Sequence, residues 1–130
     1  MTTPQQFLVS FLQEKTAAWA EARPRLTDVY AKYFGESLSQ RAERFMPREA
    51  VRAVIEDVKQ SEGVASAVAR EHFKSADLRT RYRLAASGDS WKIVGIDREC
   101  FSCRGTGQSG DSRCKKCGGE GWYEPDKDAV

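Results

Sequence analysis

The first third of the chain carries apolar residues at the three- and four-residue spacing of helices that pack on a core. Between residues 3 and 22 the apolar positions on one face are Phe7, Leu8, Phe11, Leu12 and Trp19. Thr3 precedes Pro4 and lies three residues before Gln6, which is the pattern of a capped helix start with proline at the first helical position. We therefore predict a helix over residues 3–22.

A second helix is predicted over residues 25–34. Its apolar positions on one side are Leu26, Val29, Tyr30 and Tyr33. Pro24 breaks the chain before this stretch, and Gly35 provides a stop after it. Residues 36–49 are polar and mixed in charge, without a clear period, and we expect them to connect to the next element.

Residues 50–60 fit two patterns. Their apolar positions Val51, Val54, Ile55 and Val58 follow a helical spacing. The same stretch is rich in β-branched residues, and Ser61-Glu62-Gly63 followed by residues 64–73 is typical of a hairpin turn with a return strand. The hairpin context leads us to predict a strand over residues 50–60.

Residues 78–98 alternate with the period of two that is typical of strands. One set of alternating positions is Leu78, Thr80, Tyr82, Leu84 and Ala86, and the other is Arg79, Arg81, Arg83 and Ala85. Ser87-Gly88-Asp89-Ser90 predicts a turn, and residues 91–96 its partner strand. Helices followed by an antiparallel meander predict an α+β fold, with N-terminal helices packed on an antiparallel sheet.

Composition narrows the class of protein without identifying it. The 130 residues are 40% hydrophobic and 31% charged, with a formal net charge of +2. These values are typical of a globular protein, and the charge is too small to indicate nucleic-acid or membrane binding by itself. The N-terminus has no basic region, and Gln13, Glu14 and Lys15 interrupt its apolar residues. We therefore predict neither a signal peptide nor a membrane span, and we expect a cytoplasmic, reducing location.

All four cysteines belong to two copies of one motif, C-x-x-C-x-G-x-G. The first copy contains Cys100 and Cys103, and the second contains Cys114 and Cys117. Each C-x-x-C loop aims two thiolates at one point, and four thiolates complete the tetrahedral sphere of a structural zinc ion. Two disulfides would need an oxidising compartment, and a thioredoxin-like redox pair would need one C-x-x-C beside a βαβ pattern. We therefore predict one structural zinc ion on the four cysteines, with no open position for a catalytic water.

The repeat resembles half of the cysteine-rich domain of DnaJ-type chaperones, which carries four such units around two zinc ions. The resemblance covers residues 100–122, and it does not imply the chaperone's function because the chain has no His-Pro-Asp motif of a J-domain. We predict an α+β roll domain over 1–98, a zinc-binding module over 99–123 and a disordered tail over 124–130.

A second resemblance concerns the helices and the closing hairpin, which reads Arg-Tyr-Arg-Leu-Ala-Ala-Ser-Gly-Asp-Ser-Trp-Lys-Ile-Val over residues 81–94. Residues 4–98 resemble the nuclear-transport-factor-two-like (SnoaL-like, cystatin-like roll) superfamily. The resemblance implies a sheet that curves around the helices to form a cone, often in a homodimer. That superfamily includes isomerases, dehydratases, small-ligand binders and protein-binding scaffolds, so the fold alone does not identify the function.

A ligand or substrate in such a cone would contact the residues that line it. The candidates are Trp19, Tyr30, Tyr33, Tyr82, Asp57 and His72. Asp57 is expected to share a strand face with Val51, Ala53 and Ile55. Aromatic stripes more often form core and a lone histidine more often has no catalytic role, so no catalytic residue is assigned.

Our interpretation of the sequence is a non-enzymatic binding or scaffold domain that is stabilised by zinc and has a protein or peptide as its partner. The alternative is a small-ligand-binding or isomerase/dehydratase-like enzymatic roll. Nucleic-acid binding is the weaker alternative, because the excess of positive residues over 98–117 is not accompanied by interleaved aromatic and basic residues. The row Arg79, Arg81 and Arg83 fits a recognition patch for an acidic partner or a phosphate backbone. This row also fits a solvated strand face.

Overall fold

The computed structural model describes residues 2–21, 24–42, 52–72, 77–100, 103–110, 112–115 and 117–123. Three helices lie within the described residues that precede the sheet. They are α1 (Pro4–Glu21), α2 (Pro24–Tyr33) and the short α3 (Glu36–Ser39). The predicted capping box begins α1: the Gln6 backbone N–H donates to the Thr3 hydroxyl at 3.1 Å, and the Thr3 N–H donates to the Gln6 side chain at 3.1 Å. Both predicted long helices are confirmed, and α3 was not predicted because one turn carries too little periodicity.

Four strands form the predicted antiparallel meander. They are β1 (Arg52–Ser61), β2 (Val64–His72), β3 (Asp77–Ser87) and β4 (Ser90–Glu99), and the two-residue β7 (Trp122–Tyr123) adds to the β4 edge. The strand prediction for residues 50–60 is confirmed from Arg52 onward, and residues 50 and 51 lie outside the described residues. Pairing with β2 decides the conformation here, because a hairpin overrides the local helical spacing.

A β-bulge in β1 changes which side chains face the helices. Ile55 pairs with Ala69 while Asp57 pairs with Val68, so Glu56 is the extra residue. Ala53, Ile55 and Val58 consequently pack against the core, and Asp57 is exposed on the opposite face. The expectation that Asp57 shares a face with Ile55 is therefore wrong, because an inserted residue shifts the alternation by one position.

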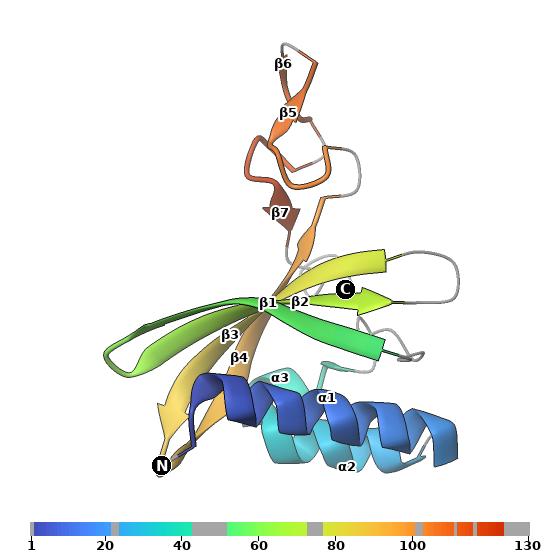
Figure 1. The fold of residues 1–130 in the computed structure, drawn as a ribbon, viewed down its shortest axis with the longest axis vertical. Coiled ribbons are helices and arrows are strands. Elements are labelled where there is room, and N and C mark those ends of the chain that lie inside the picture. The colour runs from blue at the N-terminus through green and yellow to red at the C-terminus, as the bar shows by residue number, and fades with distance from the viewer. Residues whose placement is uncertain are drawn as a thin grey trace.

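The helices cover one face of the curved sheet, and this face holds the core (Figure 1). Aromatic rings interlock at its centre: Phe11 contacts Tyr33, Phe34 and Tyr82 with ring centroids 5.4–5.7 Å apart. The larger buried side chains around them are Phe7, Leu8, Leu12, Val29, Tyr30, Leu38, Leu84, Trp91, Ile93 and Ile96. This confirms the predicted α+β fold class with N-terminal helices packed on a curved antiparallel sheet.

The C-terminal part of the chain leaves the sheet and returns to it at the same edge. From the end of β4 the chain enters the cysteine-rich segment, residues 100–121, which projects away from the sheet (Figure 1). A small hairpin of β5 (Gln108–Ser109) and β6 (Ser112–Arg113) lies in the middle of this segment. The chain then rejoins the sheet at β7, where Trp122 pairs with Glu99 and Tyr123 with Arg98. The predicted tail over 124–130 lies outside the described residues.

Candidate metal centre

The four cysteine sulfurs converge on one point at the base of the cysteine-rich segment. All four sulfurs lie within 4.8 Å of one another. The Cys100 and Cys114 sulfurs are 3.9 Å apart, and the Cys103 and Cys117 sulfurs are 3.6 Å apart. Four thiolates at the usual Zn–S distance would have sulfurs about 3.8 Å apart at the corners of a tetrahedron. The cysteines are free thiols, so the donor set and its spacing fit a closed four-sulfur metal site.

Two matching knuckles, residues 100–107 and 114–121, form the site by exchanging backbone hydrogen bonds. The Cys100 N–H donates to the Gly121 carbonyl at 2.8 Å, and the Cys114 N–H donates to the Gly107 carbonyl at 2.9 Å. Each knuckle thus binds the last glycine of the other through its own first cysteine. The repeated motif in the sequence produces an approximate two-fold relation, which brings the two pairs of sulfurs together.

Backbone N–H groups also point at the second sulfur of each knuckle. The Gly107 N–H donates to the Cys103 sulfur at 3.3 Å, and the Gly121 N–H donates to the Cys117 sulfur at 3.1 Å. Burial by itself raises the pKa of Cys103, but the Gly107 N–H and the three other thiols lower that pKa to about 6. Thiolates are the form that binds metal, so this arrangement favours the ligating state of Cys103.

Glycine allows the two knuckles to approach this closely. A Cβ on Gly107 would lie 2.3 Å from the carbonyl oxygen of Gly119, and a Cβ on Gly121 would lie 2.5 Å from that of Gly105. Gly107 also has a φ of +79°, which side chains other than glycine's rarely adopt. The glycines of the motif are therefore needed for contact between the knuckles as well as for the turn within each.

The cysteines form a buried cluster separate from the main core. Cys100, Cys103 and Cys114 are buried, and Cys117 is partly exposed beside them. With four sulfurs bound, a tetrahedral ion has no position left for substrate or water. The chemistry of this donor set is therefore that of a structural metal.

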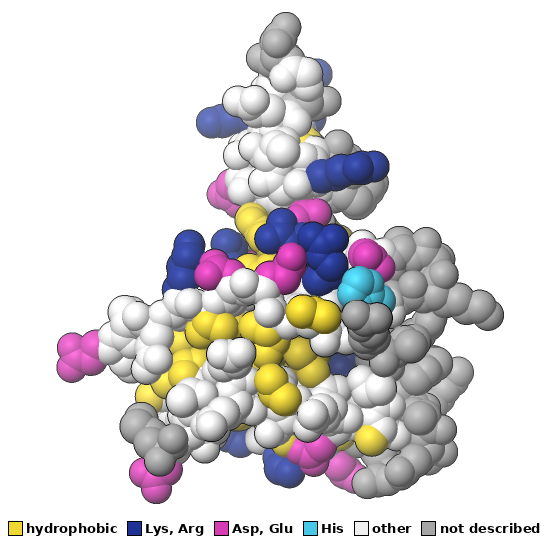
Figure 2. Space-filling model, in the orientation of Figure 1, with side chains coloured by type: hydrophobic (Ala, Val, Ile, Leu, Met, Phe, Trp, Pro, Cys, Tyr) yellow, Lys and Arg dark blue, Asp and Glu magenta, His cyan; other side chains and the backbone are white. Residues whose placement is uncertain are grey.

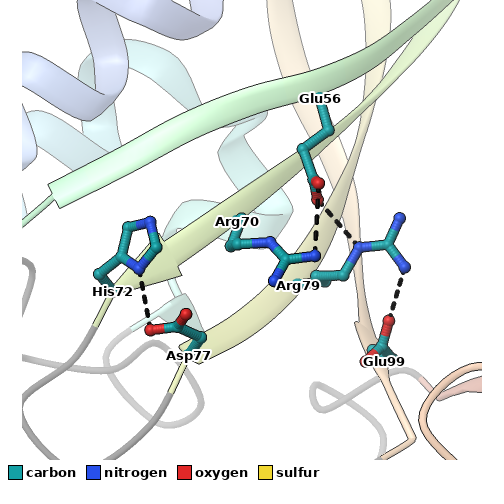
Figure 3. Close-up of polar contacts among 6 residues, drawn as sticks. All are labelled: Glu56, Arg70, His72, Asp77, Arg79 and Glu99. Atoms are coloured by element: carbon teal, nitrogen blue, oxygen red, sulfur yellow. Dashed lines mark hydrogen bonds and ion pairs between the residues drawn. The ribbon is translucent and has the colours of Figure 1, made fainter.

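A series of ion pairs on the outer face of the sheet connects the four long strands to one another (Figure 3). Glu56 of β1 contacts Arg70 of β2 at 3.4 Å and accepts a hydrogen bond from Nε of Arg79 in β3 at 3.0 Å. Arg79 also donates to Glu99 of β4 at 2.8 Å, and Cys100 follows Glu99 directly. We call these four residues the outer-face ladder, and it orients the strand from which the first knuckle begins.

The structure separates the residues that were predicted to line a cone pocket. Tyr30, Tyr33 and Tyr82 are buried within the core. Asp57 and His72 instead lie on the outer face, where Nδ1 of His72 is 2.9 Å from a carboxylate oxygen of Asp77 (Figure 3). The side chain of Trp19 lies outside the described part of the chain. These six residues are thus not gathered at one place.

Two buried ionisable residues were missed by the sequence reading. Lys15 of α1 is 1% exposed and Glu71 of β2 is 4% exposed, and both lie beside Tyr82, whose hydroxyl donates to Glu71. The Lys15 ammonium is 3.9 Å from the same Glu71 oxygen, and no described residue accepts a hydrogen bond from it. Their spacing was a usable signal: Lys15 continues the apolar stripe four residues after Phe11, and Glu71 falls on the core-facing alternation of β2.

Lys15, Glu71 and Tyr82 form a group that we call the buried trio, and burial shifts the pKa of Lys15 and of Tyr82. Burial lowers the pKa of Lys15, although the negative charge of Glu71 opposes that shift. Burial also raises the pKa of Tyr82 well above its usual value, and the neighbouring Glu71 raises it further. Burial in the core therefore favours the neutral forms of Lys15 and Tyr82.

Comparison with known proteins gives one similar fold. A solved structure described as an NTF-2-like protein of unknown function from Shewanella oneidensis MR-1 has 17% sequence identity, a TM-score of 0.46 and alignment over 70% of this chain and 94% of that one. No protein-family model matches the chain, and no curated protein gives a significant match. At this level the similarity assigns neither a family nor a function, so the resemblances to the nuclear-transport-factor-two-like superfamily and to DnaJ-type domains stay predictions. None of the described helices is long and apolar enough to cross a membrane.

Proposed function

We propose that the protein is a non-enzymatic binding or scaffold domain in which the cysteine-rich segment is held together by one structural zinc ion. The observation that carries the proposal is the convergence of all four sulfurs from two knuckles that hydrogen-bond to each other. A tetrahedral set of four sulfurs is typical of zinc or of iron–sulfur chemistry. A closed site of two C-x-x-C knuckles is typical of structural zinc.

In this proposal residues 1–98 form a roll domain and residues 99–123 form a module that the metal makes rigid. Among the described residues, the backbone of the module pairs with the roll where β7 adds to the end of β4. Metal binding therefore supplies the stability that such a short segment lacks, because it has little apolar surface to bury. A protein or peptide is the partner that a rigid projecting module best serves, since it presents exposed side chains from a fixed backbone.

The test is metal analysis of the purified protein, together with a thiol count after denaturation. We expect about one zinc ion per chain and four reduced thiols. Iron–sulfur chemistry would give a coloured protein with iron and sulfide instead. Oxidised cysteines without metal would contradict the proposal.

Cysteine variants extend this test. We expect Cys103→Ser and Cys117→Ser to release the metal and to lower stability by several kcal/mol, because metal binding is coupled to folding of the segment. Ser112→Ala is the matched control, since Ser112 is exposed in the same segment and belongs to neither C-x-x-C pair. Retention of metal by both cysteine variants would show that the ligands are other residues.

A second candidate function is binding of a small ligand on the helix-covered side of the sheet, and the buried trio favours it. An ammonium group with three donors and one distant carboxylate is an expensive group to bury. A carboxylate or carbonyl oxygen of a ligand would satisfy it. Mass spectrometry of small molecules released on denaturation tests this candidate: a stoichiometric acid or carbonyl compound that is lost in Lys15→Met would support it, and its absence would remove it.

A further inference from the structure

A hollow of about 380 Å³ lies between the sheet and the second knuckle. One wall comes from the outer face of β3 and β4, and the other from the end of the second knuckle and β7. Its lining residues are Arg81, Arg83, Asp97, Glu120, Trp122 and Tyr123. Charged side chains of both signs gather where the cysteine-rich segment meets the sheet (Figure 2).

Arg81 is held in this hollow by two partners that leave much of its guanidinium unused. Its Nε donates to Asp97 at 2.9 Å, and its central carbon lies 4.9 Å from the ring centre of Trp122. The two terminal NH₂ groups take no part in the hydrogen bond to Asp97. A guanidinium fixed in this way presents a planar fork of donors that matches a carboxylate.

A glycine in β4 provides the space for a second arginine. A Cβ on Gly95 would lie 2.3 Å from the central guanidinium carbon of Arg83, so this guanidinium packs directly against the backbone of Gly95. Its Nε is 3.2 Å from the same Asp97 oxygen that Arg81 contacts. One nearly buried carboxylate thus sets the position of two guanidinium groups side by side.

We propose that this hollow is the docking site for a peptide segment that carries an acidic side chain. The Arg81 fork would bind the carboxylate, while Trp122 and Tyr123, both partly exposed, would supply contact area to its neighbouring residues. Arg104 and Arg113 are exposed elsewhere on the cysteine-rich segment, where their charges would favour the approach of an acidic partner.

Two acidic groups in the lining favour an acidic peptide over a nucleic acid as the partner. Asp97 and Glu120 lie in the same hollow as the arginines. They would repel the several closely spaced phosphates of a nucleic acid more strongly than the single carboxylate of a peptide side chain. The surface therefore fits an acidic peptide better than a polyanion.

The second wall of the hollow depends on the metal centre, so this inference rests on the proposed function. Glu120, Trp122 and Tyr123 follow Cys117 within six residues. Gly121 lies between Glu120 and Trp122 in the chain. Its N–H donates to the Cys117 sulfur, and its carbonyl accepts a hydrogen bond from the Cys100 N–H. Loss of the metal would release this wall, and docking should therefore require the filled site.

The experiment is a titration of the ¹⁵N-labelled full chain, purified with zinc, followed by NMR. The probe is a nine-residue peptide with a single central glutamate flanked by leucines. The same peptide with glutamine in place of glutamate and a nine-nucleotide thymidine strand serve as comparison ligands. We expect the glutamate peptide to shift the Trp122 indole signal and the amides around the hollow, and to bind at least about fivefold more tightly than the glutamine peptide.

Substitutions inside and outside the hollow test whether the glutamate peptide binds there. Arg81→Gln should weaken binding about tenfold, because a charge-assisted fork is lost, while Asp97 keeps its contact with Arg83. Arg81→Lys should fall between Arg81→Gln and the natural protein, since it keeps the charge without the fork. Lys115→Gln removes one exposed charge outside the hollow and should change binding less than about twofold.

Zinc content, measured on every sample, separates the two proposals. One zinc per chain with unchanged binding in Arg81→Gln, or tighter binding of the thymidine strand, would overturn the docking site alone. A zinc-stripped chain that still binds the peptide would overturn the metal dependence. A chain that never contained metal would overturn the proposed metal centre itself.

Discussion

At the scale of single residues, the metal centre depends as much on the absence of side chains as on the cysteines. The sulfurs supply the ligands, but the knuckles meet only because Gly107 and Gly121 lie against the backbone of the opposite knuckle. Two kinds of glycine must be distinguished here. Some are required by backbone conformation alone, and others also by close contact.

The pair Gly107→Ala and Gly110→Ala tests this distinction. Both glycines have positive φ, at +79° and +65°, but only a Cβ at Gly107 would collide with backbone, since Gly110 has open space. Gly110→Ala should cost about 1 kcal/mol through backbone strain alone. Gly107→Ala should in addition lower metal affinity at least about tenfold, as measured by competition with a chromophoric chelator. Equal effects of the two substitutions would contradict the close-contact explanation.

At the scale of elements, the strands carry two polar groupings on opposite faces. The outer-face ladder joins β1, β2, β3 and β4 beside the first knuckle. Partial burial raises the pKa of Glu56, but hydrogen bonds and charge from Arg79 and Arg70 lower it below its usual value. A carboxylate with a lowered pKa stabilises the folded chain above its unfolded pKa, and this contribution disappears as pH falls through the folded pKa.

Glu56→Gln is therefore expected to have a pH-dependent effect on stability. At pH 7 the loss should be at most about 1 kcal/mol, since its ion pairs are exposed to solvent. The difference from the natural protein should begin to shrink as pH falls below about 4.3, the ordinary glutamate pKa expected in the unfolded chain, and should vanish below the lowered pKa of Glu56 in the folded chain. Urea unfolding at several pH values measures it, with the exposed Glu62→Gln as control. A difference that stays constant to pH 3 would contradict the role of the carboxylate charge.

The buried trio connects α1 to β2 on the opposite face. Removing one member of a buried ion pair leaves the other charge unpaired, which costs about 3–5 kcal/mol, whereas replacing both members is often neutral or stabilising. Glu71→Gln alone should therefore destabilise the protein by about 3 kcal/mol. The double variant Lys15→Met with Glu71→Gln should lie within about 1 kcal/mol of the natural protein, because the glutamine still accepts the Tyr82 hydrogen bond.

Chemical denaturation followed by circular dichroism measures both variants. If the double variant is as unstable as Glu71→Gln, then Lys15 stabilises the fold directly and is not held there at a cost. If it is as stable as expected, the trio contributes little to stability. Its presence would then strengthen the case for a ligand on that side of the sheet.

At the scale of the whole molecule, two separate clusters carry the stability. The larger one lies between the helices and the sheet, and the smaller one consists of the four cysteines. They meet where β4 continues into Cys100 and β7 returns beside it. Such an arrangement predicts that the smaller cluster can unfold while the larger one persists.

Removal of metal by a chelator should accordingly loosen only the C-terminal part. We expect amide hydrogen exchange over residues 100–123 to become at least about 100-fold faster. The far-ultraviolet circular dichroism of the helices and strands should change little. Addition of zinc should restore the protection. Cooperative unfolding of the whole chain on chelation would show instead that the roll depends on the metal.

Local patterns in the sequence determined much of this picture. Helical spacing and the capping box located α1 and α2, and the period of two located β3 and β4, because each of these signals needs only neighbouring residues. The repeated motif identified the four sulfurs as one set, since the turn of a C-x-x-C loop is itself local. Their convergence within 4.8 Å agrees with that expectation.

Only the tertiary structure decided which side chains share a surface. The bulge at Glu56 placed Asp57 on the outer face, because register depends on pairing with β2 and not on the sequence of β1 alone. The same long-range packing brought Lys15 to Glu71, and Arg81 to Trp122, from distant parts of the chain. Local sequence determines elements and turns through short-range sterics, whereas a site between elements depends on contacts that form only when the whole chain is folded.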